Sequence, residues 1–284
     1  IYLNDVTNYS EWSKSQSPQN IWEPIGGNFA GTLDGNGHSI VGVYINSNED
    51  KTGFFRELSL NSIPTIKNIQ LKNIFVAGES KTGGLVGHAT FLDCTNVTVM
   101  GKISGKDSVG GFVGDGVGRR ITGPINFVNC SNYASVEGKE NKVGGIIGNY
   151  SNSGSTNDKL LINNCRNSGS VSGNEFVGGL GGCFIAETDS QGIMVSKSIN
   201  EGTIGGCSKI GGIIGEIDSN MKTFEISQVC NFGNISATEG NAGGIVGVAY
   251  VGWRLSKMDN LYNTGKVSGT VAGGLAGYGG TFTY

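Results

Sequence analysis

The sequence predicts an all-β protein that forms one parallel β-helix, or β-solenoid, of about eight coils with an irregular N-terminal cap. Two observations lead to this prediction. A short glycine motif recurs at a nearly fixed interval, and the apolar runs between its copies are only two to four residues long. Glycine also accounts for 50 of the 284 residues. That content disfavours helices and suits a chain that turns sharply several times per coil.

The glycine motif is typified by Val-Gly-Gly-Ile-Ile-Gly at residues 143–148. The first glycines of one degenerate and seven clear copies are Gly53, Gly83, Gly110, Gly144, Gly178, Gly211, Gly243 and Gly273. Successive copies lie 27–34 residues apart. A propeller blade needs about 40–45 residues and longer strands, so each repeat fits one coil of a parallel β-helix better. Equivalent residues should then stack about 4.8 Å apart.

Two columns of apolar residues around the glycine pair are expected to be core ladders. One column holds Leu85, Phe112, Ile146, Leu180, Ile213, Ile245 and Leu275. The column before the pair holds Thr82, Val109, Val143, Val177, Ile210, Ala242 and Ala272. A bend at the pair would reset the in-and-out alternation, so the pattern leaves open which column faces inward.

A second signature lies between the glycine copies and begins with an asparagine, as in Asn-Ser-Gly-Ser-Val at residues 167–171. Its asparagines are Asn132, Asn167, Asn200, Asn231 and Asn263. Stacked carboxamides hydrogen-bond along a parallel stack. We therefore expect a structural ladder here and not a ligand site.

Residues 1–28 break the repeat and are expected to form an N-terminal strand and cap, with the parallel β-helix over residues 29–284. A solenoid end exposes unpaired strand edges and core, so some cap is required. Trp12 and Trp22 are expected to close the core. Residues 33–38 contain Asp-Gly and Asn-Gly, which predict a tight turn more strongly than an acid–base pair of Asp34 and His38.

Residues 22–26, residues 29–40 and the Gly-Gly-Leu-Val-Gly copies resemble the GLUG-motif proteins of bacteria, over about residues 20–280. In that family the motif recurs in large secreted and cell-surface proteins. They include repeat regions of some IgA-specific metallopeptidases and adhesin-like proteins. The resemblance implies a β-solenoid scaffold in a secreted or surface setting, and it implies little about activity.

Net charge and the length of apolar segments exclude some kinds of partner. The net charge is −3 and there is no basic run, so we do not expect a nucleic-acid partner. No apolar segment approaches 18 residues, so no membrane-spanning segment is expected. The chain begins at Ile1 without Met or a signal peptide and stops at Tyr284 soon after a glycine motif. We therefore expect a processed product or part of a longer polypeptide.

The six cysteines are Cys94, Cys130, Cys165, Cys183, Cys207 and Cys230. None belongs to a Cys-x-x-Cys pair, so no metal site or cofactor is expected. Cys130 and Cys165 each lie two residues before a ladder asparagine and should stack on neighbouring coils. They are expected to be buried free thiols, and a disulfide between adjacent coils is the alternative.

No catalytic motif is present. The chain has two histidines and no His-Glu-x-x-His, so the peptidase activity of the IgA-specific relatives is not expected here. It also lacks a Walker A lysine and a Gly-x-Ser-x-Gly elbow. The residues that follow the motif form a column of His88, Asp115, Asn149, Cys183, Glu216, Val248 and Tyr278. His88 and Asp115 should lie within about 5 Å, and Asp115 and Glu216 about 14 Å apart, too far for a glycosidase pair.

The two halves of each coil differ in character. The segment from the turn after the ladder asparagine to the next glycine pair is nearly constant in length, whereas the other half varies and is more polar. Such variation maps to loops on one face, often the binding face. The candidate ligand-binding residues there are Tyr150, Glu187, Asp189, Tyr250, Trp253 and Arg254, with Arg119 and Arg120 in the same half. Tyr250 and Trp253 could stack on a sugar ring, or these aromatics could simply cover the side of the helix.

These observations favour a non-catalytic, secreted or cell-surface bacterial β-solenoid. It would be an adhesin-like or stalk module that binds a glycan or an extracellular protein through its loop face. Two alternatives stay open. One is a β-helix carbohydrate-active enzyme, either a polysaccharide lyase or a glycoside hydrolase, which two carboxylates within about 10 Å in a groove would favour. The other is a scaffold fragment of a larger surface protein.

Overall fold

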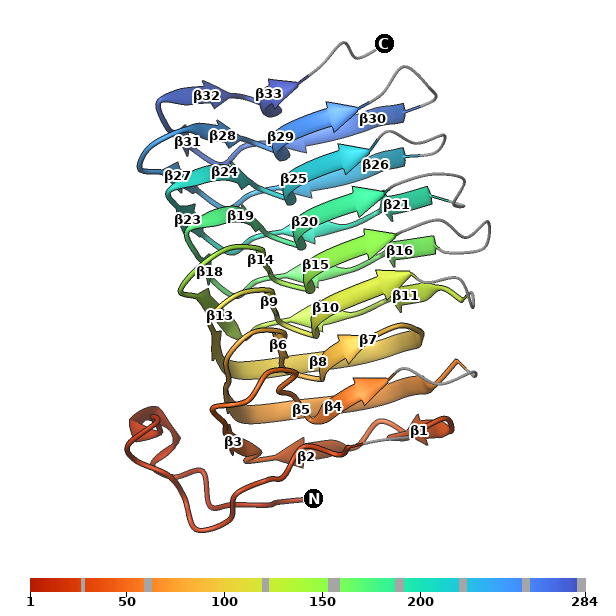
Figure 1. Ribbon diagram of the computed structural model, residues 1–284, viewed down its shortest axis with the longest axis vertical. Helices are drawn as coiled ribbons and strands as arrows, with labels where there is room; N and C mark the ends of the chain where they lie inside the picture. Colours follow the sequence, from red (N-terminus) through yellow and green to blue (C-terminus); the bar gives the residue numbers. More distant parts are fainter. Residues whose placement is uncertain are drawn as a thin grey trace.

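The computed structural model describes residues 1–26, 29–58, 63–118, 123–152, 159–186, 192–219, 224–251 and 256–279. The chain winds into a stack of coils, with the N-terminus at one end and the last coil at the other (Figure 1). The strand pairs run parallel and in register from coil to coil. The prediction of an all-β parallel solenoid is therefore confirmed.

Three sheets form the sides of the stack. The eight-stranded sheet consists of β4 (Phe55–Leu58), β7 (Val86–Ala89), β10 (Val113–Gly118), β15 (Ile147–Asn152), β20 (Gly181–Ala186), β25 (Ile214–Ser219), β29 (Val246–Val251) and β33 (Ala276–Gly279). The seven-stranded sheet consists of β6 (Thr82–Gly83), β9 (Val109–Gly110), β14 (Val143–Gly144), β19 (Glu175–Gly178), β24 (Ser208–Gly211), β28 (Asn241–Gly243) and β32 (Val271–Gly273). Each glycine copy therefore supplies one strand of the eight-stranded sheet.

The third side is an 18-stranded sheet. Its early strands are β1 (Thr32–Asp34), β2 (Ser39–Val41), β3 (Tyr44–Asn46), β5 (Thr65–Ala77) and β8 (Leu92–Gly105). In the middle coils it contains β11 (Ile125–Val128), β12 (Ser131–Asn132), β13 (Ser135–Gly138), β16 (Lys159–Asn163), β17 (Arg166–Asn167) and β18 (Val171–Ser172). The last strands are β21 (Gly192–Ser196), β22 (Ile199–Asn200), β23 (Ile204–Gly206), β26 (Phe224–Asn231), β27 (Ile235–Ala237), β30 (Ser256–Asn263) and β31 (Val267–Ser268).

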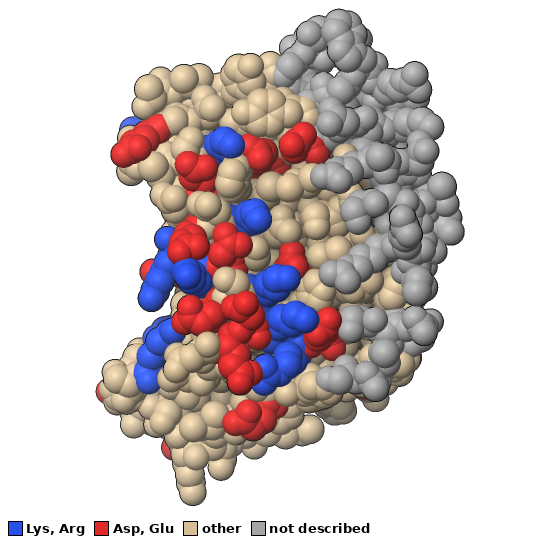
Figure 2. All heavy atoms as spheres, viewed as in Figure 1, with Lys and Arg blue, Asp and Glu red and all other residues tan. Residues whose placement is uncertain are grey.

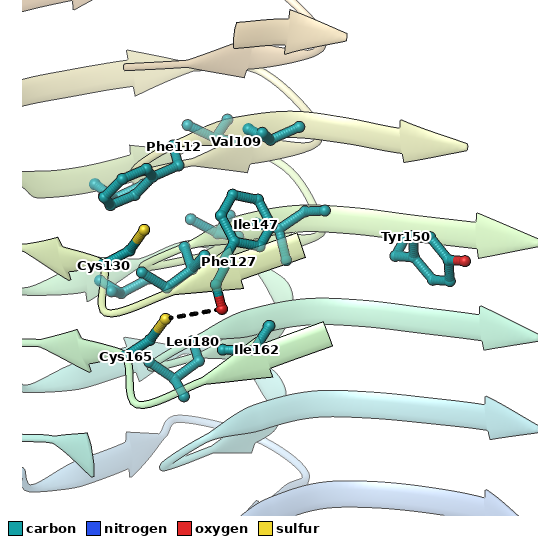
Figure 3. Packing of buried hydrophobic residues seen from close by; sticks show 14 of the residues in the cluster. Val109, Phe112, Phe127, Cys130, Ile147, Tyr150, Ile162, Cys165 and Leu180 are labelled. Carbon is teal, nitrogen blue, oxygen red and sulfur yellow. Dashed lines mark hydrogen bonds between the residues drawn. The ribbon is translucent and has the colours of Figure 1, made fainter. Parts of the chain in front are cut away.

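Both predicted apolar columns face inward. Phe112, Ile146 and Leu180 are fully buried, and so are Val109 and Val143 of the other column. Figure 3 shows Val109, Phe112 and Leu180 in the same core as Phe127 and Ile162. Burial of each large apolar side chain contributes roughly 1.5–3 kcal/mol. One continuous core therefore runs along the stack.

The cysteines are free thiols. Cys130 lies above Cys165 in the core (Figure 3), and its sulfur is 3.7 Å from that of Cys94. The Cys165 thiol donates to the carbonyl of Phe127. These thiols fill the interior as small apolar side chains.

The N-terminal segment covers the first coils. A short 3₁₀ helix, η1 (Tyr9–Glu11), leads to Trp12, which is only 5% exposed and packs edge-on against Tyr9 and Tyr44. Trp22 stacks on Phe54 with ring centroids 4.6 Å apart. Both tryptophans thus pack against core residues.

The interior asparagine column is a hydrogen-bonded ladder. The side-chain amide of Asn132 donates to Oδ1 of Asn167 at 2.8 Å, and each later member donates to the next at 2.7 Å, ending at Asn263. Each amide also donates to the carbonyl two residues ahead in its own turn. The first four carboxamides are 0% exposed, so this ladder satisfies polar groups that water cannot reach.

The two sequence signatures meet inside each coil. A Cβ added at Gly145, the second glycine of its pair, would lie 2.5 Å from Oδ1 of Asn167 and 2.1 Å from the carbonyl of Gly179. Gly111, Gly179, Gly212 and Gly244 lie in the same way against their own ladder asparagines. The second glycine is therefore required because the amide column occupies the space of a side chain.

Candidate functional site

The structure corrects the position of one predicted loop residue. Tyr150 is 1% exposed and lies in the core on β15, not on a loop surface (Figure 3). The register pairs Ile147 with Gly181 and Asn149 with Cys183, and it omits Gly148. Gly182 is skipped at the same place on β20, so both strands break the alternation together. Tyr150 then lies in the core, whereas Asn149 joins the polar column through Asp115. Gly116, the partner of Tyr150 on β10, leaves room for the ring, which lies 3.4 Å from where a Cβ would be.

Tyr250 is the predicted site residue that the structure places on the surface. It lies on β29, is 47% exposed, and its ring centroid is 6.0 Å from that of Tyr278. Its partner in the register of the neighbouring strand is Asp218. The other proposed loop residues, namely Glu187, Asp189, Trp253, Arg254, Arg119 and Arg120, lie outside the described residues.

The column after the glycine motif is a hydrogen-bonded polar column on the eight-stranded sheet. His88 Nδ1 lies 3.0 Å from Oδ2 of Asp115, which confirms the predicted neighbourhood. The amide of Asn149 donates to Oδ1 of the same aspartate at 2.8 Å. On the other side, Nε2 of His88 lies 3.9 Å from Oε1 of Glu57. The imidazole thus lies between two carboxylates, each on an adjacent coil.

Lysines run beside this polar column. Each of them lies two residues before the first glycine of a motif copy and has a positive φ of 59–63°, namely Lys51, Lys81, Lys142 and Lys209. Lys51 pairs with Glu57 at 2.7 Å, Lys81 with Asp115 at 3.1 Å, and Lys209 with Glu216 at 2.8 Å. Figure 2 shows the result, which is a band where basic and acidic side chains alternate and neither sign predominates.

The third glycine of the motif brings Asp115 beside Lys81, whereas Lys51 and Lys209 pair with acids of their own repeats. A Cβ at Gly114 would lie 2.5 Å from the backbone of Lys81, in the preceding coil. Gly182 lies in the same way against Lys142, and Gly247 against Lys209. Because the backbones touch at this glycine, the side chain that follows it lies beside the lysine of a neighbouring repeat.

Burial and pairing set the charge of this column. Asp115 is 4% exposed, and burial disfavours its ionised form. Hydrogen bonds from His88 and Asn149, with the charge of Lys81, outweigh burial and hold the pKa of Asp115 well below its usual range. Burial raises the pKa of the Cys183 thiol to about 12. Asp115 is thus a fixed anion and Cys183 a neutral thiol at neutral pH.

The chemistry available to the polar column is limited. An aspartate held ionised cannot act as a general acid at neutral pH, and a neutral buried thiol is a poor nucleophile. Among the residues described, no three His, Cys, Asp or Glu side chains are grouped to hold a metal ion. In the same part of the chain, no helix is long and apolar enough to cross a membrane. The geometry suits alignment of neighbouring coils.

A second asparagine column was missed by the sequence analysis. The side-chain amide of Asn68 donates to Asp34, and Asn96, Asn129 and Asn164 each donate to the member before. These asparagines have φ of 52–55° and lie at the surface. The available signal was an asparagine three residues before a ladder asparagine, at Asn129 and again at Asn164. We call this set, from Asp34 to Asn164, the exterior ladder.

Comparison with known proteins gives several relatives. The chain is 32% identical over 111 residues to halomucin of Haloquadratum walsbyi, covering 39% of this chain and 1% of halomucin. It is 26% identical over 190 residues to the immunoglobulin A1 protease of Streptococcus sanguinis, covering 66% of this chain and 9% of the protease. It is also 26% identical over 159 residues to the zinc metalloprotease ZmpC of Streptococcus pneumoniae, covering 55% and 8%.

No protein-family model matches the chain. Among solved structures, a Bacteroides ovatus protein proposed to be an immunoglobulin A1 protease superposes with a TM-score of 0.52 and 18% identity, over 81% of this chain and 68% of that one. At this identity the likeness shows the fold alone. The chain spans less than a tenth of the length of its curated relatives. It is thus similar to short segments of much larger proteins, two of which are named as proteases.

Proposed function

We propose that this chain is a non-catalytic β-solenoid module of a secreted or cell-surface bacterial protein, built from GLUG-type repeats and adhesin-like or stalk-like in role. The observation that supports this proposal is the single buried core that runs without a break from Val43 to Ala249. With about 4.8 Å per coil, the eight-stranded sheet spans about 34 Å. Such a stack is a stiff spacer with a long lateral surface.

The relatives support the extracellular setting. Immunoglobulin A1, which the name of one relative gives as its substrate, is an extracellular protein. This chain matches under a tenth of that protease, which supports a scaffold segment of a longer polypeptide. We propose no peptidase activity for it, because the sequence contains no His-Glu-x-x-His motif.

The module would bind a glycan or an extracellular protein through the turns along one side of the stack. Tyr250 supports this part of the proposal, because an aromatic ring exposed to this degree beside Asp218 suits a hydroxylated ligand. Glu187, Asp189, Trp253 and Arg254 belong to the same proposed surface by their positions in the repeat.

The test is binding of the purified protein to a broad array of glycans and extracellular matrix proteins. We expect binding to at least one class of ligand and weaker binding by Tyr250→Ala, with Tyr133→Ala, at a similar exposure between β12 and β13, as the control. Failure to bind anything on the array would remove the binding role and leave the spacer role.

A β-helix carbohydrate-active enzyme remains a second candidate because of one observation. Glu57 and Asp115 lie on either side of His88, two coils or about 10 Å apart. Their pairing with lysines argues against this candidate. Incubation with a panel of polysaccharides tests it directly, since product formation that Glu57→Gln abolishes would establish an enzyme.

A further inference from the structure

The N-terminal segment borders an open hollow of about 570 Å³. It lies between the first residues of the chain, the η1 helix and residues 16–20. In Figure 1 this segment loops away from the first coils and returns to them. Small-molecule sites typically measure about 300–1,000 Å³, so one sugar ring with its substituents fits this space.

The walls of the hollow are held by hydrogen bonds that do not depend on a ligand. The amide of Asn4 donates to the carbonyls of Asn20 and Gly42, at 2.8 and 2.9 Å. The side-chain amide of Asn20 donates to the carbonyl of Leu3, and its backbone N–H donates to Oδ1 of Asn4. Trp12, buried against Tyr44, lines the interior. A pre-formed site loses little ordering entropy on binding.

The lining matches a neutral polyhydroxylated ligand. Amide and hydroxyl side chains predominate, namely Asn4, Asn8, Gln16, Ser17, Gln19 and Asn20. Amides offer both a donor and an acceptor, as sugar hydroxyls require. Within the described part of the chain, the side-chain amides of Asn8 and Gln19 make no hydrogen bond. They are therefore available to a ligand.

The charged and aromatic side chains of the lining restrict the class of ligand further. The lining contains the carboxylates of Asp5 and Glu11 and no Lys, Arg or His, which disfavours phosphate, sulfate and acidic sugars. The Glu11 carboxylate already accepts from Gln16 at 3.0 Å, so it is oriented within the lining. Tyr2 lines the same hollow and is 78% exposed. Its ring offers an apolar face to the C–H face of a sugar.

We propose that this hollow binds one neutral sugar residue of a glycan, with Tyr2 stacking on the ring and Asn8, Gln19 and Glu11 bonding its hydroxyls. The proposal rests on the glycan-binding part of the proposed function. It adds a sugar site in the cap of the solenoid to the turn surface around Tyr250.

The test is saturation-transfer NMR and titration of the whole chain with neutral oligosaccharides, namely cellotriose, maltotriose and chitotriose, and with 3′-sialyllactose as the acidic probe. We expect at least one neutral trisaccharide to bind and the acidic probe to bind at least tenfold more weakly. Tyr2→Ala and Asn8→Ala should each weaken binding at least fivefold. Tyr262→Ala, an exposed aromatic on β30, is the matched control and should bind as the parent does.

Three results would overturn the proposal: no binding of any neutral trisaccharide, equal binding by Tyr2→Ala, or binding of 3′-sialyllactose as tight as that of the neutral sugars. Equal binding by Tyr2→Ala with loss in Tyr250→Ala would move the glycan to the turn surface and keep the proposed function. Because Tyr2 and Asn8 are exposed, their variants should fold, and unchanged thermal unfolding curves would verify this.

Discussion

The interior and exterior asparagine ladders use the same side chain and the same stacking, but in different surroundings. Asn167 is 0% exposed, and its amide makes two hydrogen bonds while its Oδ1 accepts a third. Asn164, three residues earlier, is exposed and donates one bond to Asn129. Water can replace the exterior bond, but it cannot reach the interior ones. The exterior asparagine is selected by its backbone φ of 52°, and the interior one by the need to pair buried polar groups.

The largest expected effect is at the interior ladder. Asn167→Ala leaves one N–H of the Asn132 amide and the Oδ1 of Asn200 unpaired in a dry interior, so unfolding should cost about 3–5 kcal/mol less. Urea titration measures the difference. Asn164→Gly is the matched control, because it removes an exposed bond and relieves the positive φ. It should change stability by no more than about 0.5 kcal/mol. Similar losses for both variants would contradict the comparison.

The glycine that abuts the interior ladder comes next. Gly145→Ala places a methyl group 2.1 Å from a backbone carbonyl, and it should destabilise the fold by about 2–3 kcal/mol. Gly205→Ala is the control, since nothing lies within 4 Å of its added Cβ. Denaturant midpoints of the two variants measure the difference. A tolerant Gly145→Ala would show that the amide column can shift to make room.

The third prediction concerns the polar column, where the stacked side chains of neighbouring coils include a charged one, Asp115. Asp115→Asn should lower stability by about 1–3 kcal/mol at pH 7, because a charged acceptor is lost beside His88 and Lys81. The pKa of Asp115 is depressed in the folded state. Its contribution is therefore complete above the unfolded value of about 3.9 and is lost as pH falls through the folded value. Stability measured between pH 5 and pH 2 should fall more steeply in the parent than in Asp115→Asn. Parallel curves would refute this role.

The smallest effect is expected at the cap. The Tyr9 hydroxyl donates to the carbonyl of Ile74 at 2.8 Å, and Tyr9→Phe should cost about 1 kcal/mol. Burial raises the pKa of Tyr9 above its usual value. The contribution is therefore present below the unfolded value of about 10 and is lost as pH rises above it. Trp12 fluorescence followed from pH 8 to pH 12 should report cap release in the parent and a flatter curve in the variant.

The coils could be predicted from the sequence because the residues that form them are close together in the chain and recur in every repeat. Residues such as Ile146 and Val143 recur at each glycine copy, and a column of like residues can be recognised by eye. The inward position of Tyr150 could not be predicted, since it depends on Gly148 being skipped in the pairing of β15 with β20. The contact between Gly145 and Asn167 joins two motifs that are separated along the chain, so neither motif alone indicates it.

The sequence did not indicate the exterior ladder, for a different reason. Its members recur with interruptions, because Lys197 and Gln228 adopt the same positive φ in later coils. A requirement on backbone conformation admits several residue types, so no single letter marks the column. The hollow of the cap could not be predicted from the sequence either, because it forms where hydrogen bonds between Asn4 and Asn20 join two separate parts of the segment.

The two ladders also have opposite polarity. Interior amides donate toward the C-terminal coil, because the carbonyl of each turn fixes which end of the carboxamide must carry the N–H groups. Exterior amides donate toward the N-terminal coil, because Asp34 is ionised and can only accept from Asn68. The side-chain dipoles of the two columns therefore point in opposite directions along the stack. One aspartate at the first turn sets the direction of the whole exterior chain of dipoles.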